Sequence, residues 1–126
     1  MSEYLLLAAG GVAGTLARYF LSGLIKKIFS AHLAFGTFTV NLIGCFILGL
    51  IVVLADQKSI LTPSVRLFLM TGFCGAFTTF SAFIFEVADL TQGGRTLMAF
   101  VYILASIGLG LLSFFAGSWL AARLPV

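Results

Sequence analysis

Two long stretches without a charged residue limit what this chain can fold into. Residues 33–55 and 96–122 both exceed the roughly 20 apolar residues needed to cross about 30 Å of hydrocarbon. Two further apolar stretches, at about 4–25 and 63–88, reach a similar length with a few charges near their ends. Only 9% of the 126 residues are charged and 61% are hydrophobic, so the charges cannot cover a water-facing surface. The sequence predicts an all-α membrane protein, with residues 1–126 forming one domain of four transmembrane helices.

The composition also argues against several classes of function. The seven basic residues are scattered and form no stripe that would follow a phosphate backbone, so nucleic acid is not an expected partner. No His, Asp, Glu or Cys residues group at metal-ligand or nucleophile spacing, so we do not expect an enzyme. Cys45 and Cys74 lie in apolar runs, where free cysteine behaves as a small hydrophobe. His32 is expected at the surface, and the first run, which no basic region precedes, is expected to be a span rather than a signal peptide.

The basic residues give almost no preference for one orientation in the membrane. Four helices place both termini on one side, and flanking basic residues normally decide which side that is. Here three oppose three: Lys58, Arg66 and Arg123 against Lys26, Lys27 and Arg95. A chain of this kind can insert both ways, and two opposite copies can pair about an axis in the membrane plane. We therefore expect a dual-topology antiparallel homodimer, since adding Arg18 tips the count by only one. The alternative is an orientation set by a partner or by a further weak bias.

Residues 72–85, GFCGAFTTFSAFIF, are unusual for a plain spanning helix. Gly72 and Gly75 weaken helix propensity, and the hydroxyls that follow can compensate opened backbone hydrogen bonds. The pattern predicts a break in the third helix near mid-membrane, where unwound backbone coordinates ions in other membrane proteins. The alternative is an unbroken packing segment that is rich in Phe and small residues.

Small and polar residues recur one helical turn apart in the other spans. Gly10 and Gly14 form a GxxxG pair whose face continues to Arg18, and such pairs usually mark close helix packing. Arg18 is expected at a protein-lined aqueous vestibule, because a cation in lipid is costly. Tyr102 and Ser106 begin a partly hydroxylated seam, which continues through Gly110, Ser113 and Gly117.

Two polar residues carry alternatives that the sequence leaves open. Asn41, one turn after Thr37, is the amide at membrane depth and is either interhelical glue or a ligand contact. Glu86 follows the third uncharged run and is expected to be a solvated interfacial carboxylate, with a gating or ion-sensing role as the alternative. Donors and electropositive ring edges suit an anion, whereas backbone carbonyls at a break suit a cation. Both ions can coexist if a fixed cation sits at the break.

Three segments resemble the signatures of the Fluc, or CrcB, fluoride-channel family. They are GGVAGTLARY at 10–19, GTFTVNLIGCFILG at 36–49 and GFCGAFTTFSAF at 72–83. The similarity covers essentially the whole chain. It implies passive export of fluoride across the cell (inner) membrane, giving fluoride resistance, by a multi-pass antiparallel homodimer embedded in lipid. It also implies two pores per dimer and a structural sodium ion at the dimer centre.

By position, the resemblance implies a role for each matching residue. Asn41, Phe80 and Phe83 match pore residues, Tyr102 and Ser106 match a hydroxyl track, and Thr37 and Ser81 are assigned to the same path. Gly75 and Thr78 match the residues whose backbone carbonyls hold sodium. Arg18 matches the signature arginine of the first helix, and Glu86 matches a vestibule glutamate. Some relatives carry a further serine where this chain has Gly110.

Two other functions remain as alternatives. A small dual-topology multidrug or cation antiporter shares the size, the number of spans and the charge balance, but it needs a proton-coupled carboxylate in the membrane. The first span has none, since Glu3 lies outside it. A non-transporting membrane assembly subunit would make the small-residue seams simple packing surfaces.

Overall fold

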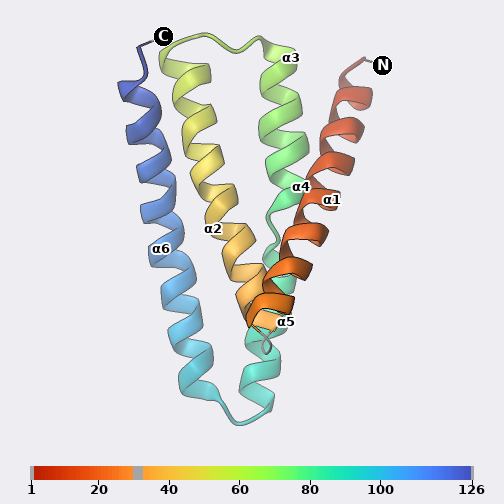
Figure 1. Cartoon of the computed structure of the whole chain (residues 1–126), viewed down its shortest axis with the longest axis vertical. Helices are drawn as coiled ribbons and strands as arrows, with labels where there is room; N and C mark the ends of the chain where they lie inside the picture. The colour runs from red at the N-terminus through yellow and green to blue at the C-terminus, as the bar shows by residue number, and fades with distance from the viewer. Residues whose placement is uncertain (1, 30–32, 126) are drawn as a thin grey trace.

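Four membrane-length helical spans run side by side, with both chain termini at one end (Figure 1). The computed structural model describes residues 2–29 and 33–125; His32 lies outside them. The first span is α1 (Ser2–Phe29), the second is α2 (Leu33–Val52) with the π-helical turn η1 (Val53–Gln57), and the fourth is α6 (Thr96–Arg123). The third comprises α3 (Pro63–Arg66), the π-helical η2 (Leu67–Cys74), α4 (Gly75–Phe77) and α5 (Phe80–Gln92). The prediction of an all-helical protein with four spans is confirmed.

Several helices extend further than the sequence indicated. The sequence bounds the first span at about residue 25, whereas α1 continues through Lys26 and Lys27 to Phe29. Lysine is a good helix former, and a positive charge in the last turn is favourable at the helix C-terminus. The second and third spans likewise continue to Gln57 and Gln92, so the acidic residues near their ends lie within helix.

The first span packs against the third through the predicted glycine face. A Cβ atom on Gly14 would lie 2.3 Å from the Phe73 carbonyl oxygen, and one on Gly10 would lie 2.5 Å from that of Phe68. Only glycine allows these backbones to approach so closely. The prediction that Gly10 and Gly14 mark a helix-packing face is confirmed.

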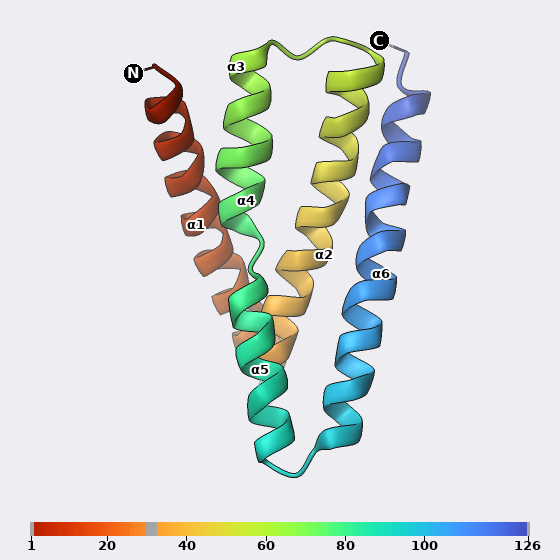
Figure 2. The ribbon, with the colours of Figure 1, turned by 180° about the vertical axis from the view of Figure 1, so that it is seen from behind.

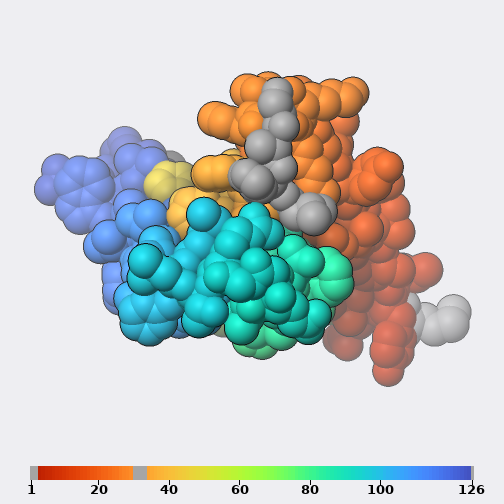
Figure 3. All heavy atoms as spheres, turned by 90° about the horizontal axis from the view of Figure 1, so that it is seen from below, coloured from red at the N-terminus to blue at the C-terminus, as the bar shows by residue number. Residues whose placement is uncertain are grey.

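The second and fourth spans meet along a second close seam. A Cβ atom on Gly117 would lie 2.1 Å from the Phe46 carbonyl oxygen, and one on Gly49 would lie 2.1 Å from that of Phe114. Ser113 adds an interhelical hydrogen bond, donating to the Leu42 carbonyl at 2.8 Å. Helix α6 therefore forms one side of the molecule, while α1 forms the other; the view from the α5–α6 end shows both (Figure 3).

A two-residue extended segment separates α4 from α5. Thr78 has φ −83° and ψ 156°, and Thr79 has φ −146° and ψ 113°. The unwound link is visible about midway along the third span (Figure 2). It lies against α2, where Gly44 leaves room for the methyl group of Thr78. The fold thus brings irregular backbone together with the polar residues of α2.

Candidate ion path

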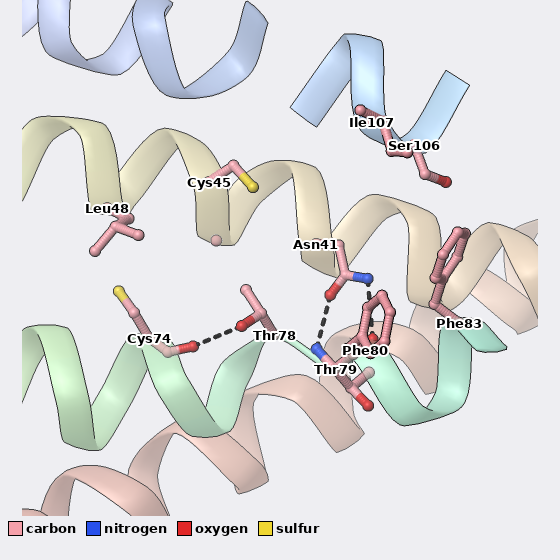
Figure 4. Close-up of a pocket in the computed structure, with 11 residues that line it drawn as sticks. Asn41, Cys45, Leu48, Cys74, Thr78, Thr79, Phe80, Phe83, Ser106 and Ile107 are labelled. Atoms are coloured by element: carbon pink, nitrogen blue, oxygen red, sulfur yellow. Dashed lines mark hydrogen bonds between the residues drawn. The ribbon is translucent and has the colours of Figure 1, made fainter. Parts of the chain in front are cut away.

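Asn41 binds both backbone polar groups of Thr79 in the extended segment. The Thr79 N–H donates to Asn41 Oδ1 at 2.8 Å, and Asn41 Nδ2 donates to the Thr79 carbonyl at 3.1 Å (Figure 4). Polar backbone inside a membrane must be satisfied by protein, and one amide does so here for both groups. Asn41 therefore joins α2 to the third span through hydrogen bonds. Its side chain also lines the groove described below.

The pairing at the extended segment leaves two carbonyls without their helical hydrogen bonds. In an unbroken helix Gly75 would accept from the Thr79 N–H, and Thr78 would accept from the Ala82 N–H. Instead the Thr79 N–H donates to Asn41, and the Ala82 N–H donates to Thr79 Oγ1 at 3.3 Å. The carbonyls of Gly75 and Thr78 are thus left for other partners.

Arg18 binds one of the two carbonyls that lie between Gly75 and Thr78 in the sequence. Its Nε donates to the Ala76 oxygen at 3.0 Å, and the side chain is half-buried. Arg18 continues the glycine face of α1, and its guanidinium therefore lies at the end of α4. This contact adds a positive charge beside the extended segment.

A groove of about 340 Å³ lies between α2, the extended segment and α6 (Figure 4). Its lining comprises Asn41, Gly44, Cys45, Leu48, Cys74, Thr78, Thr79, Phe80, Phe83, Ser106 and Ile107. No carboxylate or basic side chain is among these residues. The groove offers an amide, hydroxyls, thiols and phenylalanine rings, and ring edges carry partial positive charge. This chemistry favours a small anion over a cation.

Ser106 contributes an unpaired hydroxyl to this groove. Its hydroxyl oxygen is fully buried and has no hydrogen-bond partner among the described residues. Buried hydroxyls are normally paired, so an unpaired one that lines a groove points to a ligand or water there.

Beside the groove, Glu86 forms a closed polar cluster with two hydroxyls. Thr37 Oγ1 donates to Glu86 Oε1 at 2.6 Å, and the Tyr102 hydroxyl donates to Glu86 Oε2 at 2.7 Å. All three side chains are buried, with Glu86 only 6% exposed. The expectation of a solvated interfacial carboxylate is wrong. Helix α5 continues past Glu86, and the spacing of Phe83, Glu86 and Leu90 places the carboxylate on the inward face.

Aromatic contacts connect the groove to this cluster. The rings of Phe83 and Tyr102 meet edge to face with centroids 5.1 Å apart, and Phe80 lies 5.9 Å from Phe83. Phe83 is 7% exposed, whereas Phe80 is 74% exposed in the single chain. A chain of rings therefore runs from the surface beside the extended segment to the buried carboxylate.

The structure divides the predicted path residues into three sets. Asn41, Phe80, Phe83 and Ser106 line the groove, while Thr37 and Tyr102 belong to the Glu86 cluster. Ser81 is exposed, with its hydroxyl 3.4 Å from that of Thr79. The sequence reasoning missed Cys45 as a lining residue, although its position four residues after Asn41 places both on one face of α2.

Comparison with known proteins gives matches over nearly the full chain. A sequence model of the family described as "CrcB-like protein, Camphor Resistance (CrcB)" matches residues 5–118. A protein from Chlorobaculum tepidum named "Fluoride-specific ion channel FluC" is 44% identical over 121 residues, which cover 96% of this chain and 95% of that protein. Proteins with the same name are 42% identical over 121 residues in Chlorobium phaeobacteroides and 41% identical over 124 residues in Dehalococcoides mccartyi. These two matches cover 96% and 98% of this chain, and 93% and 95% of the relatives.

Proposed function

Because this chain belongs to the CrcB-like family, we propose that it is a fluoride channel through which fluoride leaves the cell passively. The observation that carries the proposal is the groove between α2, the extended segment and α6. It combines an unpaired buried hydroxyl with phenylalanine rings, and no carboxylate lines it. In this proposal the path is formed by Asn41, Phe80, Phe83 and Ser106, with Ser81, Thr37 and Tyr102 along its continuation.

Selectivity follows from the hydration of fluoride. The ion is small and strongly hydrated, so a pore must replace its water with close donors and positive ring edges. The amide of Asn41 and the hydroxyl of Ser106 are such donors, and Phe83 is held by its contact with Tyr102. A narrow, rigid lining of this kind rejects the larger chloride.

The membrane potential supplies the driving force. Hydrogen fluoride is a weak acid, so it enters an acidified cell as a neutral molecule and ionises inside. An inside-negative potential then drives the anion outward, at about 2.3 kcal/mol per charge for each 100 mV. The protein accordingly acts in the cell (inner) membrane and gives fluoride resistance without ATP.

The active unit in this proposal is a dual-topology antiparallel homodimer with two pores. A single chain leaves the edge of the groove open, because Phe80 and Ser81 beside the extended segment are exposed. Gly75 is exposed as well, and a Cβ atom there would meet only the Met70 carbonyl oxygen, at 3.9 Å. A second copy on this face would cover the broken third helix and complete both paths.

The proposal also includes a structural sodium ion, held at the extended segment and the start of α4. The carbonyls of Gly75 and Thr78 are released from the helical ladder, and hard carbonyl oxygens of unwound backbone suit sodium. One such pair from each copy would hold the ion at the dimer centre. Bound sodium would supply a fixed positive charge between two anion paths, while Asn41 keeps the carbonyls oriented through Thr79.

Glu86 gives the antiporter alternative one supporting observation. A proton-coupled antiporter needs a carboxylate in the membrane, and Glu86 is buried within the third span. Transport by such a protein follows a proton gradient, whereas channel flux follows the fluoride gradient and the voltage alone. Collapsing the proton gradient therefore separates the two functions.

The test is ion efflux from liposomes that contain the purified protein. A potassium ionophore releases the counter-voltage, a proton ionophore removes any pH gradient, and chloride is measured in parallel. We expect fast loss of fluoride with chloride retained. Folded protein that releases no fluoride, or releases it only under a proton gradient, would contradict the channel.

A further inference from the structure

We propose that Gly44 is a positioning residue for the ion path. Because it lacks a side chain, α2 admits the methyl group of Thr78, and this contact fixes the extended segment that forms one wall of the groove. The inference rests on the proposed function and deepens it, since it concerns a residue to which that function gives no role.

Helix α2 holds the extended segment at two successive residues. Asn41 binds both backbone polar groups of Thr79. Gly44 lies three residues further along α2, on the same face, and receives the side chain of Thr78. Figure 4 shows the Thr78 side chain between the third span and α2. One face of α2 thus holds Thr79 through hydrogen bonds and Thr78 through shape.

The contact at Gly44 leaves no space for a methyl group on α2. A Cβ atom on Gly44 would lie 2.2 Å from Thr78 Cγ2 and 3.2 Å from Phe77 Cδ1. Carbon atoms in van der Waals contact are about 3.5–4.0 Å apart. An alanine at this position therefore requires its neighbours or α2 itself to move.

The neighbouring side chains are held in place and cannot relieve this clash by rotation. The Phe77 ring is 3% exposed and stacks on Phe73, with centroids 5.5 Å apart. Thr78 Oγ1 donates to the Cys74 carbonyl at 2.9 Å. The β-branched side chain of threonine is stiff about χ1, and a rotation that moved the methyl group would break this hydrogen bond. The backbone of the extended segment must then shift.

Helix α2 is also prevented from moving away from the extended segment. Its opposite contact is the close seam with α6, where a Cβ atom on Gly49 would lie 2.1 Å from the Phe114 carbonyl oxygen. Backbones that already touch leave no space for a rigid shift of α2. The added methyl group would therefore displace Thr78 rather than the helix.

A displaced Thr78 changes the groove in two ways. Thr78, Thr79 and Phe80 all line it, so its wall moves with them. The Thr78 carbonyl, which lacks its helical partner because the Ala82 N–H donates to Thr79 Oγ1, turns as well. Both the width of the path and the direction of this carbonyl thus depend on the contact at Gly44.

Helix propensity predicts the opposite sign for a substitution at this position. Glycine inside a helix lowers helix stability relative to alanine, and Gly44 lies in the interior of α2. If the contact with Thr78 had no role, Gly44→Ala would strengthen α2 and leave the flux unchanged. A loss on this substitution therefore reports the contact.

The experiment is a double-mutant cycle that exchanges one methyl group between the two residues. Gly44→Ala adds a methyl group, and Thr78→Ser removes the one that it would meet while keeping the hydroxyl. Thr78→Val keeps that methyl group and removes the hydroxyl. Fluoride efflux from liposomes is measured per folded protein, and the effect of Gly44→Ala is taken as a ratio within each Thr78 background.

We expect Gly44→Ala to slow efflux about tenfold when Thr78 is present, a barrier increase of about 1.4 kcal/mol. The same substitution should slow efflux less than about twofold in the Thr78→Ser background, because the clashing group is gone. In the Thr78→Val background the loss of about tenfold should remain. An equal loss in the Ser and Val backgrounds would overturn the proposal.

Gly23→Ala is the matched control. It makes the same change in a membrane-spanning helix, but a Cβ atom on Gly23 would meet no atom of the described residues within 4 Å. Gly23 is not among the residues that line the groove. Its substitution should leave efflux close to wild type in every Thr78 background, and a loss equal to that of Gly44→Ala would contradict a specific role for Gly44.

The unfolding midpoint in detergent separates positioning from packing. Gly44→Ala should lower the midpoint, and Thr78→Ser should restore it together with the efflux. A midpoint that recovers while efflux does not would assign Gly44 to packing alone and overturn the inference. If wild type carries no fluoride, the proposed function itself fails; a conducting wild type without rescue by Thr78→Ser overturns only the role of Gly44.

Discussion

Two polar regions lie side by side on the α2–α6 seam, and they differ in how far their donors are paired. In the Glu86 cluster, the hydroxyls of Thr37 and Tyr102 both bind the carboxylate at 2.6 and 2.7 Å. In the groove one turn away, Ser106 Oγ is buried without a partner in the described parts of the chain. The first region is closed, and the second is open to an ion.

This difference separates hydroxyls that are already paired within the protein from a hydroxyl that can bind an ion. A fully paired buried network is rigid, whereas an unpaired buried donor carries a cost unless something binds it. The cluster fixes Tyr102, whose ring meets Phe83 edge to face and so supports the wall of the groove. Substitutions in the cluster should therefore lower stability, and substitutions in the groove should mainly change flux.

The largest effect is expected for Asn41→Ala. This variant removes a groove donor and leaves both polar backbone groups of Thr79 without their partner. Fluoride efflux from liposomes should fall about 100-fold, a barrier increase of about 2.7 kcal/mol, while the protein still assembles as a dimer. Ser113→Ala is the control, because it loses a hydrogen bond between the same helices outside the groove. Equal flux in the two variants would remove Asn41 from the path.

Glu86→Ala should have the largest effect on stability. It leaves the buried hydroxyls of Thr37 and Tyr102 without an acceptor, which should cost about 2 kcal/mol in the free energy of unfolding. Glu86→Gln keeps the volume and one acceptor oxygen, so it should lose less. Denaturation in detergent measures both, with the exposed Thr91→Ala as the control. A loss no larger than that of the control would show that the cluster is not closed.

Tyr102→Phe should have an intermediate effect. It deletes one hydrogen bond to Glu86 but keeps the ring that supports Phe83. We expect a loss of about 1 kcal/mol in the free energy of unfolding, measured as for Glu86→Ala. Tyr102→Leu, which also removes the ring, should reduce flux further, and equal flux in both variants would mean that the ring does not support the path.

Ser106→Ala should have the smallest effect on stability. No internal hydrogen bond is lost among the described residues, so the free energy of unfolding should change by less than about 0.5 kcal/mol. The fluoride flux should nevertheless fall about threefold, or roughly 0.7 kcal/mol of barrier. Paired unfolding and efflux measurements on one preparation test this separation, and a large loss of stability with unchanged flux would reverse the assignment.

Much of the helix arrangement could be predicted from composition and spacing. Apolar runs of membrane length predicted the four spans, and the Gly10–Gly14 pair predicted the packing face of α1. These features depend on local sequence alone. The ends of the helices were predicted less accurately, because lysines near a helix end can remain helical, as Lys26 and Lys27 do in α1.

The partners of the polar residues could not be predicted in the same way. The burial of Glu86 depends on two hydroxyls that are 49 and 16 residues away in the sequence. The Asn41–Thr79 pairing spans 38 residues. Such pairings depend on how spans pack, which a single sequence does not specify. The four-residue spacing of Asn41 and Cys45 did, however, indicate that both lie on one face of α2, where both line the groove.

Fluoride efflux through Phe80→Ile is the most direct test that the groove is the ion path. Phe80 lines the groove, whereas Phe85 on the same helix does not line it and is 64% exposed, so Phe85→Ile is the matched control. Both variants should assemble as dimers in detergent and be reconstituted at equal density. We expect efflux through Phe80→Ile to fall at least about tenfold, with Phe85→Ile close to wild type. Normal efflux through Phe80→Ile would place the fluoride path elsewhere.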